Sequence, residues 1–379
     1  MDGGPARQER PRQWNRRPRD RRPLHRDHAA HARHHRLRRV GRHGGLGFVT
    51  PLPLAALLAG AAFAAEPTPP AEVIVAVVGD IRVGGPIGRL AERFGLKDPV
   101  SRVRRRLKAD FLLGNLECAV TERGKAADKT WTFRAPEKEL DILRDAGFDW
   151  LGLANNHTMD YGVQGLEDTL AALKKRGFAS LGAGRNAEAA RRPLFVEKNG
   201  LRIGVLAFTT TIPEAHWAGP KKAGVSYANF ARLPEWIRDA KKQCDVLLVF
   251  YHGGTELSET PNPVQRDFAR IVVDAGADAV IGHHPHVVQP AEIRGNALIL
   301  YSLGNFLFVS PTPGTERAVI ARLHVSRRGV RAELVPININ GGRLRPASDA
   351  AREKIRAVLD AQGALGAHPD RVFLAEGRG

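Results

Sequence analysis

Short apolar runs that end in polar, glycine-flanked turns constrain the fold of this chain more than any other feature. Five of these runs are VIVAVVGD, ADFLLGNLE, DWLGLANNH, CDVLLVFYHGG and ADAVIGHHPH, at residues 73–80, 109–117, 149–157, 244–254 and 277–286. Apolar runs of this length, bounded by turn residues, predict buried strands. Because amphipathic stretches alternate with them, the pattern predicts an α/β protein.

The intervening segments support the same fold class. Helical spacing of apolar residues predicts helices over about 136–148, 163–176, 233–243, 262–276 and 348–361. Residues 193–209 predict a hairpin that turns at Asn199-Gly200. Further strands are predicted at 297–308, 317–325 and 330–338.

Side chains that bind metal ions follow the five strands. They are Asp80, Glu117, Asn156 with His157, His252, and the cluster His283, His284 and His286. A histidine cluster alone is also typical of a solvated loop, and Asp or Asn after a strand is typical of an ordinary turn. In open α/β sheets, however, ligands bind beyond the carboxyl ends of the strands. Five such ends on one edge of a sheet therefore favour a shared metal site.

The chemistry of these groups narrows the kind of site. Carboxylate, amide and imidazole ligands suit one or two divalent ions of manganese, iron or zinc, and the lack of a thiolate argues against a structural zinc site. A bridging carboxylate, here Glu117, holds two ions for in-line attack at phosphorus. His157 directly follows a candidate ligand and is placed to protonate a leaving oxygen as a general acid.

The strongly basic N-terminal region predicts an exported protein. Residues 1–43 contain fourteen arginines and four acidic residues, and so carry ten of the eighteen net positive charges. A basic arm can bind nucleic acid, but no nucleic-acid-binding motif follows it, and we expect no nucleic-acid partner. The uncharged stretch 45–65 ends in Ala62-Phe63-Ala64, which predicts a signal peptide or an uncleaved membrane anchor.

The expected domain organisation follows from these segments. Residues 1–43 form a basic low-complexity region, either disordered or upstream of the true start, and 44–65 form the signal or anchor. A stiff linker, 66–72, leads into a folded domain, 73–345, followed by a C-terminal helix and tail, 346–379. The two cysteines, Cys118 and Cys244, form either one disulfide or two buried thiols.

The ordered motifs resemble a known family. VVGD, GNLECAVT, FRAPE, LANNHTMDYG, GAGRN, YHGGTE, IGHHPHVVQP and YSLGNFLF are similar to the CapA-type poly-gamma-glutamate capsule biosynthesis proteins, a branch of the calcineurin-like metallophosphoesterase superfamily. These motifs extend from about residue 74 to 308. The resemblance implies a four-layer α/β/β/α sandwich of the metallo-dependent phosphatase type, with metals at the strand ends.

The resemblance also implies roles for individual residues. Asp80 would bind a first metal, Glu117 would bridge, and Asn156 and His252 would bind a second, with His284 and His286 as the histidine pair. His157 would be the catalytic histidine. Asn155, His283 and Asn305 would lie around these ligands; Asn305 either orients a ligand or forms a plain turn.

Two positions depart from the superfamily pattern. Arg82 stands where a metal-binding histidine is usual, and it is either a solvated turn residue or a contact for a substrate anion. Glu117 replaces the usual bridging aspartate and is longer by one methylene group. Both departures bear on whether the site has full phosphatase activity.

Three hypotheses for function follow. The first is an exported metal-dependent protein of capsule or poly-gamma-glutamate biosynthesis with a metallophosphoesterase-type site. The alternatives are a general envelope phosphomonoesterase or phosphodiesterase, and a non-catalytic envelope scaffold that retains the fold. The expected substrate is an anionic polymer or a phosphate-bearing molecule, with membrane partners of a capsule synthase complex. The domain would lie outside the cytoplasm, whether periplasmic, extracellular or membrane-anchored.

Overall fold

The computed structural model describes residues 71–375. The predicted basic region, the predicted signal or anchor, and most of the predicted linker lie outside the described residues. Within the described part of the chain, no helix is both long enough and apolar enough to cross a membrane.

The larger of two main sheets contains eight strands in the order β17-β16-β15-β1-β2-β5-β6, with β18 beside β16. β1, β2, β5 and β6 run parallel, whereas β15 pairs with β1 in the antiparallel sense. The bounds are β1 Val73–Ile81, β2 Phe111–Leu116, β5 Trp150–Gly152, β6 Ala179–Leu181, β15 Arg317–Ser326, β16 Gly329–Asn340, β17 Arg343–Pro346 and β18 Val372–Leu374.

The second sheet contains six strands in the order β13-β14-β12-β11-β9-β8. Its four central strands are parallel, and β8 and β13 form antiparallel edges. The bounds are β8 Leu194–Lys198, β9 Leu201–Thr209, β11 Val246–His252, β12 Ala279–His283, β13 Ala291–Arg294 and β14 Ala297–Leu300. Two small sheets pair β3 (Ala119–Val120) with β4 (Arg134–Ala135), and β7 (Ala183–Gly184) with β10 (Gly224–Val225).

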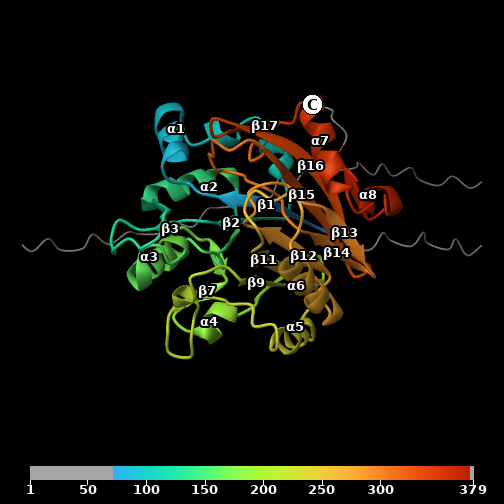
Figure 1. The fold of residues 1–379 in the computed structure, drawn as a ribbon, viewed down its shortest axis with the longest axis horizontal. Helices are drawn as coiled ribbons and strands as arrows, with labels where there is room; N and C mark the ends of the chain where they lie inside the picture. The colour runs from blue at the N-terminus through green and yellow to red at the C-terminus, as the bar shows by residue number, and fades with distance from the viewer. Residues whose placement is uncertain (1–70, 376–379) are drawn as a thin grey trace, which may run out of the picture. The chain divides into compact units, whose positions relative to one another are not determined.

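The two sheets pack face to face, and helices cover their outer faces (Figure 1). Successive strand side chains point to opposite faces, so Val75 of β1 and Leu248 of β11 share the core between the sheets. Val78 packs under α1 (Pro86–Phe94), α2 (Leu140–Ala146) and α3 (Gly162–Lys175). Val249 packs under α5 (Leu233–Lys241) and α6 (Pro263–Asp274). The predicted α/β class is confirmed.

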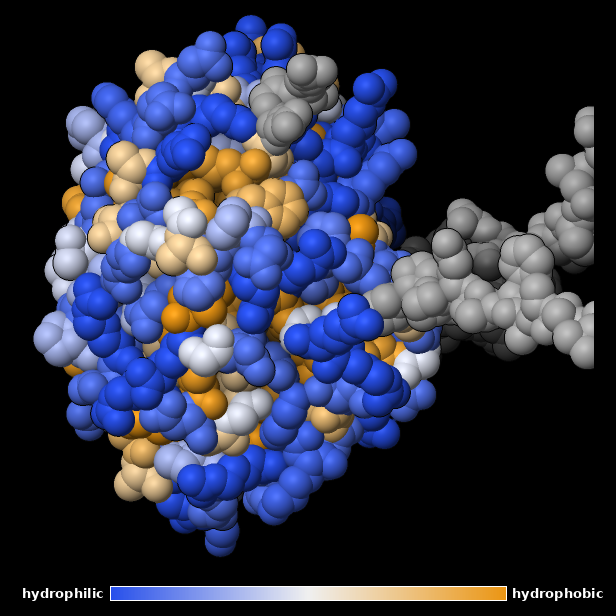
Figure 2. All heavy atoms as spheres, turned by 90° about the vertical axis from the view of Figure 1, so that its right-hand side faces the viewer, coloured by the Kyte–Doolittle hydropathy of each residue, from blue (hydrophilic) through white to orange (hydrophobic). Residues whose placement is uncertain are grey.

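The C-terminal segment belongs to the core rather than forming the predicted tail. α7 (Asp349–Leu359) and α8 (Ala364–Ala367) lead into β18, which runs parallel to β16. Ile355, Leu359 and Val372 are buried with the inter-sheet cluster. The three-residue strand was missed because so short an apolar run has no periodicity of its own. The face on the side of α7 and α8 is mainly hydrophilic, with small separate apolar patches (Figure 2).

The strand ends that carry the polar residues come from both sheets, and not from one sheet edge as the sequence alone suggested. β1, β2 and β5 belong to the first sheet, and β11 and β12 to the second. Close backbone approach holds β1 in place, because a Cβ atom on Gly79 would lie 1.8 Å from the Gly304 carbonyl oxygen. The two cysteines are free thiols, which removes the disulfide alternative.

Candidate metal centre

The carboxyl ends of four strands place five candidate ligands together. Asp80 lies near the end of β1, Glu117 directly follows β2, His252 ends β11, and His284 and His286 follow β12. Asp80, Glu117, His252 and His284 are buried, and the side chain of His286 is only 13% exposed. The fold thus gathers residues that are far apart in the sequence.

These side chains form two donor groups that share one carboxylate. Glu117, His252 and His284 form one group, and Asp80, Glu117 and His286 form the other, each with ligand atoms within 4.8 Å of one another. Glu117 Oε1 lies 3.4 Å from His252 Nε2 and 3.8 Å from His286 Nε2. This is the arrangement expected for a bridging carboxylate between two ions.

Glu117 provides a test of whether the residues fit a metal. Its side chain is fully buried, and neither carboxylate oxygen has a hydrogen-bond partner in the part of the chain that the structure describes. A buried carboxylate without a partner is strongly unfavourable unless a cation compensates it. Oxygen and imidazole donors that face one another also suit a divalent ion. The residues therefore fit one or two divalent metal ions.

Two residues of the histidine turn beside this site have strained backbone conformations. His284 and His286 have φ values of 97° and 59°, which non-glycine residues rarely adopt. Each such conformation costs on the order of 1–3 kcal/mol and persists where the surrounding structure holds it. The His284 N–H donates to Asp80 Oδ2 at 3.2 Å, and the buried Nδ1 of His284 has no hydrogen-bond partner. Both rings lie beside Glu117, each in one of the two donor groups.

Burial and charge set the protonation of the histidines. Burial lowers the pKa of His284 to about 3, and also lowers the pKa of His252 well below its usual value. Both rings are thus neutral, the form that binds metals. Burial opposes protonation of His286 as well, but the charge of Glu117 and the hydrogen bond with Asp80 raise its pKa to about 10. The two carboxylates therefore favour a positive charge at this point.

The pKa values of the two carboxyls move in opposite directions. Burial, and then repulsion from Asp80, raise the pKa of Glu117 well above its usual value. Burial would also raise the pKa of Asp80, but its hydrogen bond with His286 and the charge of that ring lower it overall. Paired acidic groups of this kind are typical of functional sites.

Three asparagines organise the surroundings of the ligands. Asn115 Nδ2 donates to Asp80 Oδ1 at 2.8 Å and lies 3.1 Å from His252 Nδ1. Asn155 donates to the Asn115 side chain at 3.0 Å and accepts from the His157 N–H at 3.0 Å. The Oδ1 of Asn156 lies 2.8 Å from His252 Nε2, beside the group that contains His284. Asn156 is therefore close enough to join that group as an oxygen ligand.

His157 belongs to a separate cluster beside the ligands. Its Nδ1 lies 2.7 Å from Asp160 Oδ2, and Asp160 Oδ1 lies 2.6 Å from Lys129 Nζ. Lys129 also donates to the Asn156 carbonyl oxygen at 2.7 Å. Burial lowers the pKa of His157, although Asp160 opposes this effect. Because Nδ1 faces a carboxylate, Nε2 is the nitrogen available for proton exchange.

Phe133 forms the wall of this cluster and explains the position of Arg82. The His157 ring stacks on Phe133 with the ring centres 4.0 Å apart. The Arg82 guanidinium lies 4.0 Å from the centre of the same Phe133 ring. Arg82 is half-buried, and its Nε has no hydrogen-bond partner. Arg82 thus packs against the wall of the His157 cluster and belongs to neither donor group.

His283 and Asn305 occupy different positions around the site. His283 is buried, with Nε2 3.2 Å from the Val78 carbonyl oxygen and its ring stacked on Phe250. It therefore packs in the core and is in neither donor group. Asn305 Oδ1 lies 2.9 Å from His286 Nδ1, and this contact orients the His286 ring.

The residues that the sequence analysis missed are Asn115, Lys129 and Asp160. Asp160 follows His157 by three residues in the motif LANNHTMDYG, and this spacing was the signal for it. Asn115 stands two residues before Glu117 in GNLE. Nothing in the local sequence marks Lys129, which lies in a polar loop and reaches the site only through the fold.

The fold and the site together define a class of protein. Two packed sheets with two donor groups that share a carboxylate, at the carboxyl ends of the strands, define an α/β protein with a candidate dinuclear metal centre. The chain belongs to the family described as bacterial capsule synthesis protein PGA_cap, whose model matches residues 74–310. The resemblance inferred from the motifs is confirmed.

Curated relatives and solved structures give the extent of the similarity. The chain is 36% identical over 268 residues to the PGA biosynthesis protein CapA of Bacillus subtilis, covering 69% of this chain and 70% of that protein. It is 33% identical over 289 residues to the capsule biosynthesis protein CapA of Bacillus anthracis, covering 74% of this chain and 70% of that protein. A 5'-nucleotidase precursor from Thermus thermophilus has a TM-score of 0.43 at 15% identity, covering 78% of this chain and 60% of the other. At this level of similarity, that structure does not bear on the substrate.

Proposed function

We propose that this chain is an exported, metal-dependent hydrolase of the phosphoesterase type that acts in capsule or poly-gamma-glutamate biosynthesis. The proposal rests mainly on the environment of Glu117. Its buried carboxylate is shared by two donor groups and has no hydrogen-bond partner among the described residues. Membership of the capsule synthesis family supports the pathway. Export rests on the sequence of residues 44–65, which lie outside the described residues.

Separate groups of side chains would hold the metal ions and transfer the proton. Asp80, Glu117 and His286 would hold one divalent ion, and Glu117, His252 and His284, with Asn156 beside them, would hold the other. Bound ions at such a site supply Lewis acidity toward a phosphoryl oxygen. Asn115 and Asn305 hold Asp80, His252 and His286 in fixed orientations.

Proton transfer falls to the cluster of His157, Asp160 and Lys129. Asp160 fixes the tautomer of His157 by accepting from Nδ1, so that Nε2 exchanges a proton with the leaving oxygen. Lys129 neutralises the other Asp160 oxygen and ties the cluster to the loop that carries Asn156. The substrate is a phosphate-bearing molecule or an anionic polymer, and the partners are membrane components of a capsule synthase.

Hydrolysis of an aryl phosphate by the purified chain with added manganese tests this function. Positioned general acid–base groups contribute about 10²–10⁴-fold to rate, so His157→Gln should lower turnover by a factor in this range with unchanged metal content. Glu117→Gln should lower both turnover and metal content. His368→Gln is the matched control, since His368 lies at the end of α8 and outside both donor groups.

Two results would contradict the proposal. A metal-loaded wild type that turns over neither phosphomonoesters nor phosphodiesters would favour a scaffold that retains only the fold. Full activity in the His157→Gln variant would remove the assigned proton-transfer role.

A further inference from the structure

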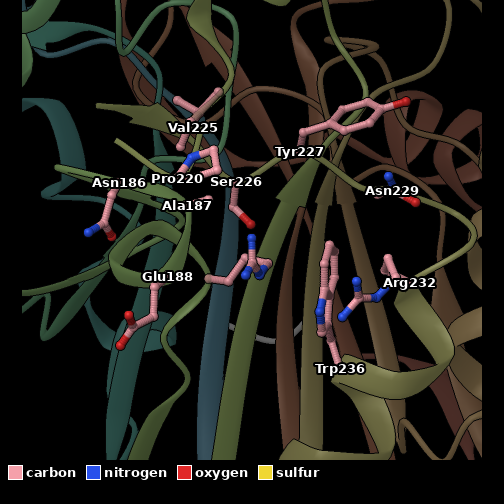
Figure 3. Close-up of a pocket in the computed structure, with 12 residues that line it drawn as sticks. Asn186, Ala187, Glu188, Pro220, Val225, Ser226, Tyr227, Asn229, Arg232 and Trp236 are labelled. Atoms are coloured by element: carbon pink, nitrogen blue, oxygen red, sulfur yellow. The ribbon is translucent and has the colours of Figure 1, made fainter. Parts of the chain in front are cut away.

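A cavity of about 510 Å³ lies outside the candidate metal centre, between α4 (Ala187–Arg191) and the start of α5. Figure 3 shows its lining, to which Ser226, Tyr227 and Trp236 contribute. None of the residues that line it is a candidate metal ligand or a member of the His157 cluster. The cavity is therefore separate from the proposed catalytic groups.

Arg191 supplies an unpaired positive charge to this cavity. Its guanidinium lies 4.3 Å from the centre of the Trp236 ring, and the side chain makes no ion pair or hydrogen bond with any residue in the range 71–375. Arg232 approaches the same ring at 5.9 Å but is held by both carboxylate oxygens of Glu235, at 2.9 and 3.0 Å. Burial, and then the charge of Arg232, lower the pKa of Arg191. Glu188, which also lines the cavity, and Glu235 oppose this effect, but neither forms an ion pair with Arg191 among the described residues.

Ser226 supplies a buried hydroxyl that also lacks a partner. The residue is 1% exposed, and its Oγ makes no hydrogen bond. Figure 3 shows this hydroxyl directed into the cavity. The backbone of Ser226 is held firmly, because its N–H donates to Gly182 and its carbonyl accepts from Thr209. A fixed hydroxyl and an arginine without an ion pair, which line the same cavity, are suited to binding an anionic group.

The dimensions and lining of the cavity indicate what kind of anion fits. A volume of about 510 Å³ lies in the range of sites for organic ligands and is far larger than one inorganic anion needs. A single unpaired guanidinium matches a singly charged carboxylate, which it binds with two parallel hydrogen bonds. Val225, Pro220 and the Trp236 ring provide apolar surface for an aliphatic stem.

We propose that this cavity binds a carboxylate on an aliphatic chain, with the carboxylate held by Arg191 and Ser226 Oγ and the chain against Trp236. A γ-linked glutamyl chain carries one such carboxylate per residue, and this identification of the ligand rests on the proposed function. Ser226 also links the cavity to the metal centre, since Thr209 bonds to the Ser226 carbonyl and donates through Oγ1 to the His252 carbonyl at 2.8 Å. The cavity is thus a subsite that holds the polymer near the hydrolytic centre.

Calorimetric titration of the full chain with a γ-linked glutamate hexamer tests the proposal, after metal removal with a chelator. Arg191→Gln should raise the dissociation constant by about tenfold or more, because a charge-assisted contact is lost. Ser226→Ala should raise it severalfold. Arg192→Gln is the matched control, since this exposed neighbour does not line the cavity, and it should change the constant by less than twofold.

Ser226→Ala also gives a readout that separates binding from folding. The hydroxyl has no hydrogen-bond partner among residues 71–375, so its removal should leave the melting temperature of the ligand-free chain unchanged or slightly raised. A merely structural serine would lower it. Inorganic phosphate should bind at least tenfold more weakly than the hexamer.

The remaining outcomes are equally decisive. Equal weakening by Arg191→Gln and Arg192→Gln would show non-specific attraction to a basic surface and would overturn the proposal. Equal binding of phosphate, or no binding of the hexamer at millimolar concentration, would also overturn it. Glu117→Gln should bind the hexamer like wild type, so loss of hydrolysis and loss of this subsite are separate results.

Discussion

Replacing Glu117 with glutamine should make the metal-free chain more stable than wild type and the metal-loaded chain less stable. In the metal-free chain, the variant should be more stable than wild type, because the buried carboxylate has no hydrogen-bond partner and lies near Asp80. The raised pKa of Glu117 already includes its attraction to His286, so the net effect of its charge is destabilising. The shape of the side chain is kept.

The expected magnitudes follow from the environment of Glu117. Removing one unpartnered buried charge is worth about 1–3 kcal/mol, because the glutamine amide remains a buried polar group but is neutral, and at roughly 2 °C per kcal/mol the metal-free variant should melt about 2–6 °C higher. With metal at 1,000 times its dissociation constant, wild type gains about 4 kcal/mol that the variant does not, so the order inverts. Differential scanning calorimetry with and without chelator measures both quantities.

The pH dependence of the metal-free proteins checks the same reasoning. The pKa of Glu117 is higher in the folded chain than the usual 4.5, so its protonated form favours the folded state. This contribution to the free energy of unfolding is fully present below pH 4.5 and is lost as pH rises from there. The advantage of the glutamine variant should therefore grow above pH 4.5. A difference that stays constant with pH would show that the charge of Glu117 is not the cause.

A second, half-buried glutamate, Glu139, provides the matched control. Burial raises the pKa of Glu139 to about 6, its Oε2 has no partner, and it lies outside both donor groups. Glu139→Gln should stabilise the metal-free chain but leave the gain from added metal intact. If Glu117→Gln destabilises the metal-free chain while metal content is unchanged, Glu117 is a structural residue and not a ligand.

Three further substitutions have expected outcomes. Lys129→Met should lower the free energy of unfolding by about 2–4 kcal/mol in chemical denaturation, because it leaves the buried Asp160 without its cation. It should also raise the pKa of His157 in an NMR titration. The exposed control Lys125→Met should change neither quantity. Gly79→Ala should abolish soluble expression, since its Cβ would lie 1.8 Å from the Gly304 oxygen, whereas Gly152→Ala, with 3.7 Å to its nearest neighbour, should be tolerated. Asn155→Ala should cost about 3 kcal/mol or more in denaturant unfolding, because its side chain bonds to Asn115, Leu116, His157 and Thr158.

The strands could be predicted from the sequence where they are long and apolar. β1, β9 and β11 are buried along nearly their whole length, and runs such as VIVAVV leave no alternative to a core strand. β6, β7 and β10 are two or three residues long, and each forms through pairing with a partner distant in the sequence. Pairing of this kind depends on the tertiary structure, so local sequence does not reveal it.

The same distinction applies to the site. Asp80, His252 and His284 could be proposed as ligands from the sequence, because each lies near the end of an apolar run and is of a residue type that binds metals. Asn115 could not, because its importance comes from packing two sheets together, which brings Asp80 and His252 within reach of one amide. An asparagine near a strand end is ordinary, and only the second sheet gives it a role.

Arg82 contacts a different part of the site from the one that its position in the sequence suggests. By the family resemblance, it stands where a metal-binding histidine is usual. In the structure its guanidinium lies against the Phe133 ring, and its charge interacts with Asp160 of the His157 cluster. Because Phe133 also stacks on His157, the main consequence of an arginine here falls on the residues proposed to transfer the proton. The ligand that would come from this position is lost, and the wall beside the proposed general acid has a cation in its place.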